Sequence, residues 1–175
     1  MREERTGGKR KKLVWTMVAL ALVTIIALGI IYVNVSNALN SALRSSLNTF
    51  ALGSVTYASA IDGTVDMNVS LSLENPTTYA LKVRAIALSF WVGGKYIGSL
   101  TVMPDQDLPL REKVSFHFVR HLTDEEVIST LRKQTYELVL DGKISASASY
   151  LFVEASWDRA IDYIREVPGI SQAKP

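Results

Sequence analysis

The sequence predicts an all-β domain, an immunoglobulin/fibronectin III-like antiparallel β-sandwich, held behind a single transmembrane helix. An apolar run without a charged residue covers residues 13–33. Seven or so short segments of alternating apolar and polar residues follow, with turn signals between them and only brief helical patterns. We expect five parts: a basic cytoplasmic tail (1–12), a transmembrane helix (13–33), a helical stalk (34–52), the β-sandwich with one short inserted helix (53–153), and a C-terminal amphipathic helix and tail (154–175).

The apolar run is long enough to cross a bilayer. Its 21 residues would rise about 30 Å as a helix, which matches the hydrocarbon core. A signal peptide has an apolar core of only about 7–15 residues, so we expect a retained anchor. Six Lys or Arg precede the run and should stay in the cytoplasm, which places the domain outside it. Ser36-Asn37-Ala38 is a small-residue cleavage site, so a released form is the alternative.

The predicted stalk carries a narrow apolar stripe at helical spacing. Its members are Leu39, Leu43, Leu47 and Phe50. Such a stripe either rests on the neighbouring domain or forms a self-association seam, and two to three turns are too short to identify a coiled coil. All four residues are therefore candidates for an interaction.

The clearest strand covers residues 64–74. One face is apolar and the other polar, as in a strand that is buried on one side; the apolar face consists of Val65, Met67, Val69, Leu71 and Leu73. The strand ends at Asn75-Pro76, because proline cannot continue a ladder of hydrogen bonds.

The next strand, residues 79–92, changes parity. Leu81 and Val83 share one parity, whereas the apolar residues from Ile86 onward share the other. A regular strand would leave one of the two sets in water, so we predict a β-bulge between Val83 and Ile86, with Arg84 at the surface and both sets buried.

The remaining strands follow the same alternation. Gly93-Gly94 fits a two-residue turn before a return strand over 95–103. A further strand covers 111–119, and residues 124–132 form the short helix, with Thr123 as its expected N-cap. From Tyr136 to Phe152 the parity is kept across Asp141-Gly142, so we favour a bend in one long strand over a hairpin turn.

Residues after 154 show helical spacing. Trp157, Ile161 and Ile164 would lie on one face of a helix that Pro168-Gly169 ends. This helix either packs on the sandwich or docks on another subunit or on the membrane surface, so these three residues are also candidates for an interaction.

Charge and composition exclude several functions. From Asn34 onward there are 13 Lys or Arg and 15 Asp or Glu, a net charge of −2, so nucleic-acid binding has no electrostatic basis. The absence of cysteine rules out disulfides, thiol chemistry and cysteine-ligated metal sites.

The sequence offers no catalytic, cofactor-binding or metal-binding set. His117 lies on the polar face of its strand, and His121 has neither a nucleophile nor metal-ligand spacing beside it. Asp105, Asp107 and Glu112 are better explained as a solvated acidic loop than as a calcium site. Asn68, in Asn68-Val69-Ser70, is the best candidate for glycosylation.

The order of these segments resembles the water stress and hypersensitive response (WHy) domain, the atypical late-embryogenesis-abundant (LEA type 2) family. The matching features lie within residues 53–153: the strand ending at Glu74-Asn75-Pro76, the strand over 86–92, the turn at 93–94, and Tyr136-Glu137-Leu138 leading to Gly142-Lys143-Ile144. The family is known from plants, bacteria and archaea. The resemblance implies a sandwich fold, a link to stress tolerance and no catalytic site.

We therefore expect a non-enzymatic protein without cofactor, anchored in the cell membrane by one span, with its amino terminus in the cytoplasm and its domain outside. It would act in protein or cell-surface contacts, as a monomer or through partners or a homo-oligomer bound at the stalk and C-terminal helix. The alternative is a structural subunit of an envelope assembly such as a pilus, an archaellum-associated complex or an S-layer contact.

Overall fold

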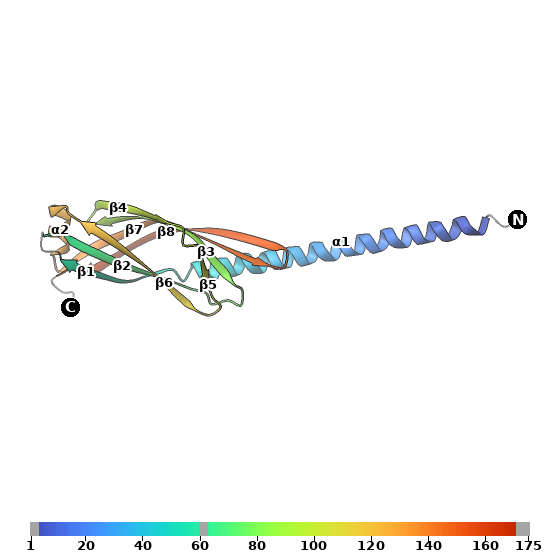
Figure 1. The fold of residues 1–175 in the computed structure, drawn as a ribbon, viewed down its shortest axis with the longest axis horizontal. Coiled ribbons are helices and arrows are strands. Elements are labelled where there is room, and N and C mark those ends of the chain that lie inside the picture. The colour runs from blue at the N-terminus through green and yellow to red at the C-terminus, as the bar shows by residue number, and fades with distance from the viewer. Residues whose placement is uncertain (1–3, 60–62, 171–175) are drawn as a thin grey trace. The chain divides into compact units, whose positions relative to one another are not determined.

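The computed structural model describes residues 4–59 and 63–170, with side chains from Lys12 onward. In order, its elements are α1 (Glu4–Leu47), β1 (Ala51–Ser59), β2 (Val65–Glu74), β3 (Leu81–Val92), β4 (Lys95–Val102), β5 (Gln106–Leu108), β6 (Lys113–Leu122), α2 (Glu125–Leu131), β7 (Thr135–Tyr150) and β8 (Val153–Pro168) (Figure 1). The chain forms two compact units, Met1–Ala38 and Leu39–Pro175, and α1 contributes to both.

The first unit is a long apolar helix. All side chains from Leu13 to Val33 are exposed. Among the described residues, one helix is long and apolar enough to cross a membrane, and it is α1. A membrane anchor and a signal sequence both have this property.

The second unit is mostly β, with two antiparallel sheets in a sandwich-like arrangement. One sheet has the order β1-β2-β6. The other has the order β4-β3-β7-β8, and its fifth strand, β5, also pairs with β3. The strands of both sheets run along the same long direction, and helix α2 lies at the end of the unit opposite the β7–β8 turn (Figure 1). The last turns of α1 belong to this unit, and Leu39, Leu43 and Leu47 are fully buried in it.

The inward face of β2 confirms the predicted strand. Its five apolar residues are all at most 3% exposed. Adjacent side chains of a strand point to opposite faces, so the polar residues between them take the outer face. The sandwich core lies between this face and the inward residues of β3 and β7.

The predicted register break in β3 is confirmed. The pairing with β7 shifts between Val83 and Ala85, so Arg84 is the inserted residue. Leu81, Val83, Ile86 and Leu88 are all buried, whereas Arg84 is exposed. The bulge therefore brings both apolar parities onto the core, as the burial argument requires.

Strand β7 confirms that Asp141-Gly142 lies within one long strand and is not a hairpin turn. It pairs with β3 and β8 without interruption through Gly142. A Cβ atom added to Gly142 would lie 2.0 Å from the carbonyl oxygen of Ala87, so only glycine allows this close approach between strands.

The inserted helix is present, but its cap is one residue later than expected. Asp124, not Thr123, is the N-cap, and its carboxylate accepts hydrogen bonds from the amides of Glu126 and Val127. Aspartate adds a negative charge at the positive end of the helix dipole, which threonine cannot do.

The predicted C-terminal helix is wrong. Residues 153–168 form strand β8, which pairs with β7 over its whole length. Its inward parity includes Arg159 and Arg165 among apolar residues, and these two charges hid the alternation of a strand. In the structure Arg159 donates to the carbonyl of Leu47 and Arg165 to the carbonyl of Leu52, so both polar heads have partners.

Candidate functional site

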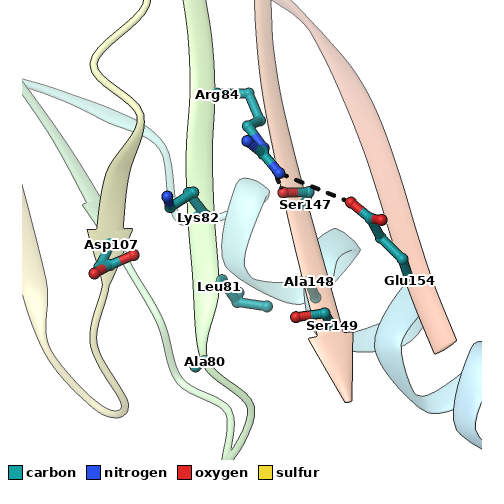
Figure 2. A pocket seen from close by; sticks show the side chains of 9 residues that line it. All are labelled: Ala80, Leu81, Lys82, Arg84, Asp107, Ser147, Ala148, Ser149 and Glu154. Carbon is teal, nitrogen blue, oxygen red and sulfur yellow. Dashed lines mark hydrogen bonds and ion pairs between the residues drawn. The ribbon is translucent and has the colours of Figure 1, made fainter. Parts of the chain in front are cut away.

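A shallow pocket of about 240 Å³ lies beside the β3 bulge. Figure 2 shows that Arg84 reaches from β3 across β7 toward Ser147 and toward Glu154 on β8. The guanidinium Nε donates to the hydroxyl of Ser147 at 2.7 Å, and Nη2 lies 3.7 Å from a carboxylate oxygen of Glu154. The bulge is what turns this side chain outward and along the sheet.

The pocket's cations also hold the loop before β5. Asp105 lies 3.1 Å from the ammonium of Lys82 and 3.0 Å from Nη1 of Arg84. The hydrogen bond from Lys82 is the largest cause that lowers the pKa of the Asp105 carboxyl below its usual range. Lys82 and Arg84 both pair with Asp105, and Arg84 also pairs with Glu154. The cluster therefore joins β3, β8 and the loop before β5.

A second feature lies on the outer face of the five-stranded sheet. Tyr96, Trp91, Val139 and Ile164 are register partners across β4, β3, β7 and β8, and we call them the apolar row. Tyr96 is 53% and Ile164 63% exposed, and the rings of Trp91 and Tyr96 are 5.6 Å apart. Four neighbouring strands therefore present a continuous apolar strip to the surroundings.

Carboxylates flank the apolar row on both sides. Glu137 and Glu166 are register partners on one side, and Asp141 and Asp162 are partners on the other. All four are exposed. Within the described residues, neither Asp141 nor Asp162 takes part in a salt bridge, and both line the same shallow hollow as Trp91 and Val139. Such a strip suits a partner that offers apolar groups beside positive charge.

The structure places the predicted stalk residues inside the domain. Leu39, Leu43 and Leu47 are fully buried and Phe50 is 7% exposed. Leu39, Leu43 and Leu47 are thus packed within the second unit, and a role of this segment in contacts with other molecules stays a prediction. Arg44 lies with its guanidinium 4.0 Å from the ring centroid of Trp157, a cation–π contact that links α1 to β8.

The three candidates of the last segment separate on β8. Trp157 and Ile161 have the inward parity, and Ile161 is buried. Ile164 has the outward parity and belongs to the apolar row. The sequence did not identify the rest of this row, although Trp91, Val139 and Ile164 all stand on the polar parity of their strands, which was the available signal.

The other sequence candidates stay separate from these features. Asn68 lies on the outer face of the central strand β2, between Thr56 and Val119, and its glycosylation stays a prediction. His121 lies 2.7 Å from the carboxylate of Asp66, with no nucleophile in that pair. Among the described residues, no group of three or more metal-ligating side chains could hold a metal ion.

No family model and no curated protein matches the chain. Solved structures do. A Northeast Structural Genomics Consortium target matches with 7% identity over 73% of this chain and 92% of its own, at a TM-score of 0.50. A protein from Archaeoglobus fulgidus matches with 10% identity over 66% and 94%, at 0.41.

The chain also matches the solution structure of a putative late embryogenesis abundant protein, the family that its sequence segments resemble. The identity is 12%, the coverage is 81% of this chain and 90% of that one, and the TM-score is 0.43. At these identities the likeness is one of fold. The chain shares its two-sheet β architecture with the consortium's target, and a late embryogenesis abundant protein is among its structural matches.

Proposed function

We propose that this chain is a single-pass membrane protein whose late embryogenesis abundant-like β-domain works outside the cytoplasm through protein or cell-surface contacts, without catalysis. The observation that carries the proposal is the contrast within α1. Leu13 to Val33 are exposed over about six turns, whereas Leu39, Leu43 and Leu47 of the same helix are fully buried. An apolar surface of that length needs an apolar surrounding, and a bilayer supplies it.

The basic tail supports the orientation. Lys and Arg next to a span are retained on the cytoplasmic side, and six of them precede Leu13. The remainder of the chain carries a small negative charge, which does not oppose its transfer across the membrane.

The apolar row supports the second half of the proposal. Its exposed aromatic and aliphatic side chains are the kind that protein interfaces bury, and the flanking carboxylates favour a cationic partner. The pocket at Arg84 supports it less, because Lys82, Arg84 and Glu154 already form internal ion pairs.

Topology is tested with single cysteines, since the chain has none of its own. Cysteine at Ser45 or Lys143, both exposed, should react with an impermeant maleimide on intact cells, and cysteine at Thr6 should react only after lysis. Reversed labelling would contradict the orientation. An epitope tag before Met1 that is absent from the mature chain would favour a cleaved signal sequence.

Binding at the apolar row is tested with an oligolysine peptide that carries one tryptophan. The full chain in lipid nanodiscs should bind it, and Asp141→Asn with Asp162→Asn should weaken binding and its salt dependence. Asp158→Asn is the matched control, because this carboxylate on β8 lies 3.0 Å from Lys143 and outside the row. Equal binding by all variants would remove the row from the proposal.

A structural subunit of an envelope assembly, in a pilus, an archaellum-associated complex or an S-layer contact, is the second candidate. The exposed Tyr96 and Ile164 favour it, because a subunit interface would bury them. Extraction in mild detergent separates the two: a monomer supports the first function, and a defined oligomer that Ile164→Asn dissociates supports the second.

A further inference from the structure

The turn of the β7–β8 hairpin exposes three large apolar side chains in succession. Tyr150 is 50%, Leu151 71% and Phe152 59% exposed. Tyr150 also packs edge-to-face against Tyr79, with ring centroids 5.8 Å apart. Apolar residues scattered singly over a surface are ordinary, but three together at the tip of a long hairpin form a patch.

The turn conformation does not explain Leu151 and Phe152. Tyr150 pairs with Val153, so Leu151-Phe152 is a two-residue turn. Leu151 has φ of 55°, a conformation that turns of this length normally give to Gly, Asn or Asp. A side chain that is disfavoured by the backbone and unused in the core points to a contact outside this domain.

The tip lies on the side of the domain from which the chain enters. Arg44 contacts Trp157 and Leu47 contacts Arg159, so α1 and β8 run in the same direction within this unit. From Trp157 back to Leu151 a strand covers about 20 Å, whereas from Arg44 back to Leu39 a helix covers about 8 Å. Within this unit the tip therefore projects about 12 Å beyond Leu39 along the direction of the last turns of α1.

The incoming chain is short. Val33, the last residue of the apolar run, stands six positions before Leu39. Even a fully extended chain of that length spans only about 20 Å, so a membrane that holds the run has its surface close to Leu39. The distance by which the tip projects beyond Leu39 is therefore comparable with the distance from Leu39 to the membrane surface.

We infer that the Tyr150-Leu151-Phe152 tip inserts into the interfacial region of the bilayer that holds the apolar run, as a second attachment of the domain. The inference rests on the proposed membrane anchoring. Leucine and phenylalanine supply the apolar contact, and the hydroxyls of Tyr150 and Tyr79 suit the level of the lipid headgroups, where tyrosine is enriched. This attachment fixes the orientation of the sandwich relative to the membrane plane.

The test uses the full chain in phosphatidylcholine vesicles, with and without spin-labelled lipids as quenchers. An environment-sensitive fluorophore is attached to cysteine at Ser149, an exposed position beside the tip. The matched site is cysteine at Tyr96, which is exposed at the opposite end of the sheet. Lipid spin labels should quench the Ser149 label and leave the Tyr96 label unchanged.

A turn variant separates insertion from misfolding. Leu151→Gly places glycine at the positive φ that favours it, and Phe152→Ser replaces the second, exposed turn residue by a polar one, so the domain should melt no lower than before. The same substitutions should abolish quenching at Ser149.

Flotation of the vesicles reports the anchoring independently. A chain that floats while the Ser149 label is quenched no more than the Tyr96 label overturns the inference and leaves the proposed function standing. A chain that does not float overturns both. Crosslinking of two tips without lipid quenching identifies a second copy as the occupant and also overturns the inference.

Discussion

The five-stranded sheet has two tight hairpin turns at opposite ends, and they differ in the residues that form them. Gly93-Gly94 joins β3 to β4 with φ of 56° and 82°, which are conformations that glycine adopts without strain. Leu151-Phe152 joins β7 to β8, and Leu151 takes φ of 55°. A positive φ favours glycine at both turns, but only the β3–β4 turn has glycine there.

The difference shows that one turn residue is explained by the local backbone conformation and the other is not. At Gly93-Gly94 the local conformation explains the sequence, because a Cβ on Gly93 would come within 2.8 Å of Thr130. At Leu151 the local conformation argues against the residue that is present. Positions of the second kind are expected where a surface serves a partner.

The largest expected effect tests whether both ends share one core. Leu43→Ala removes a fully buried side chain of α1 near the β7–β8 half of the sheet and should lower the free energy of unfolding by about 2–5 kcal/mol. Ser45→Ala, two residues away and exposed, should change it by less than about 0.5 kcal/mol. Urea denaturation of the full chain in detergent measures the free energy of unfolding of both variants. A loss for Leu43→Ala as small as that for Ser45→Ala would mean that the stalk does not stabilise the domain.

The glycine turn should be the sensitive one. Gly94→Ala meets no atom within 4 Å, so it tests the backbone conformation alone. Forcing an alanine into this left-handed region should cost about 1–2 kcal/mol in thermal denaturation. Ser99→Ala, on the exposed face of β4, is the control, and a cost at Gly94 no greater than the control's would contradict the reasoning.

The apolar turn should respond in the opposite direction. Leu151→Gly relieves about 1–2 kcal/mol of left-handed strain and costs about 0.5–1 kcal/mol through the larger entropy of the unfolded chain, so the domain should gain between about 0 and 1.5 kcal/mol. Phe152→Ser alone should be close to neutral. Differential scanning calorimetry of these two variants against Gly94→Ala gives the comparison directly, and a clear loss at Leu151 would mean that its side chain serves the fold.

The smallest effect is a pH dependence near the glycine turn. Lys95 follows this turn and lies 2.9 Å from the Asp124 carboxylate, and this hydrogen bond is the largest cause that lowers the pKa of Asp124 below its usual value of 3.8. A lowered pKa means that the folded state favours the charged form. The contribution is therefore present above pH 3.8 and is lost as the pH falls through the folded-state pKa.

Asp124→Asn separates the charge from the cap, since asparagine also caps helices well. The variant should match the parent near its acid midpoint and show a weaker fall of melting temperature with acidification. Identical acid profiles for the two proteins would show that the ion pair has no influence on stability.

Alternation of side chains predicted the interior well. The core face of β2, the break at Arg84 and the unbroken β7 all follow from one rule, that large apolar residues must share a face. The rule succeeds there because no charge stands on the inward parity of those segments.

The same rule failed for β8 and for the apolar row. Arg159 and Arg165 occupy inward positions whose partners, two backbone carbonyls, belong to residues more than a hundred positions away in the sequence. The row of Tyr96, Trp91, Val139 and Ile164 exists only through pairing across four strands. Neither property is present in any local window of sequence.

The contact between α1 and β8 joins two segments that are synthesised at well separated times. Leu47 leaves the ribosome 112 residues before Arg159, its hydrogen-bond partner. At roughly 5–20 residues per second, on the order of 10 s pass before the last strand can cover the stalk. During that interval Leu39, Leu43 and Leu47 lack the strand β8 that packs beside them in the folded domain, and a ribosomal pause before residue 153 would prolong this state.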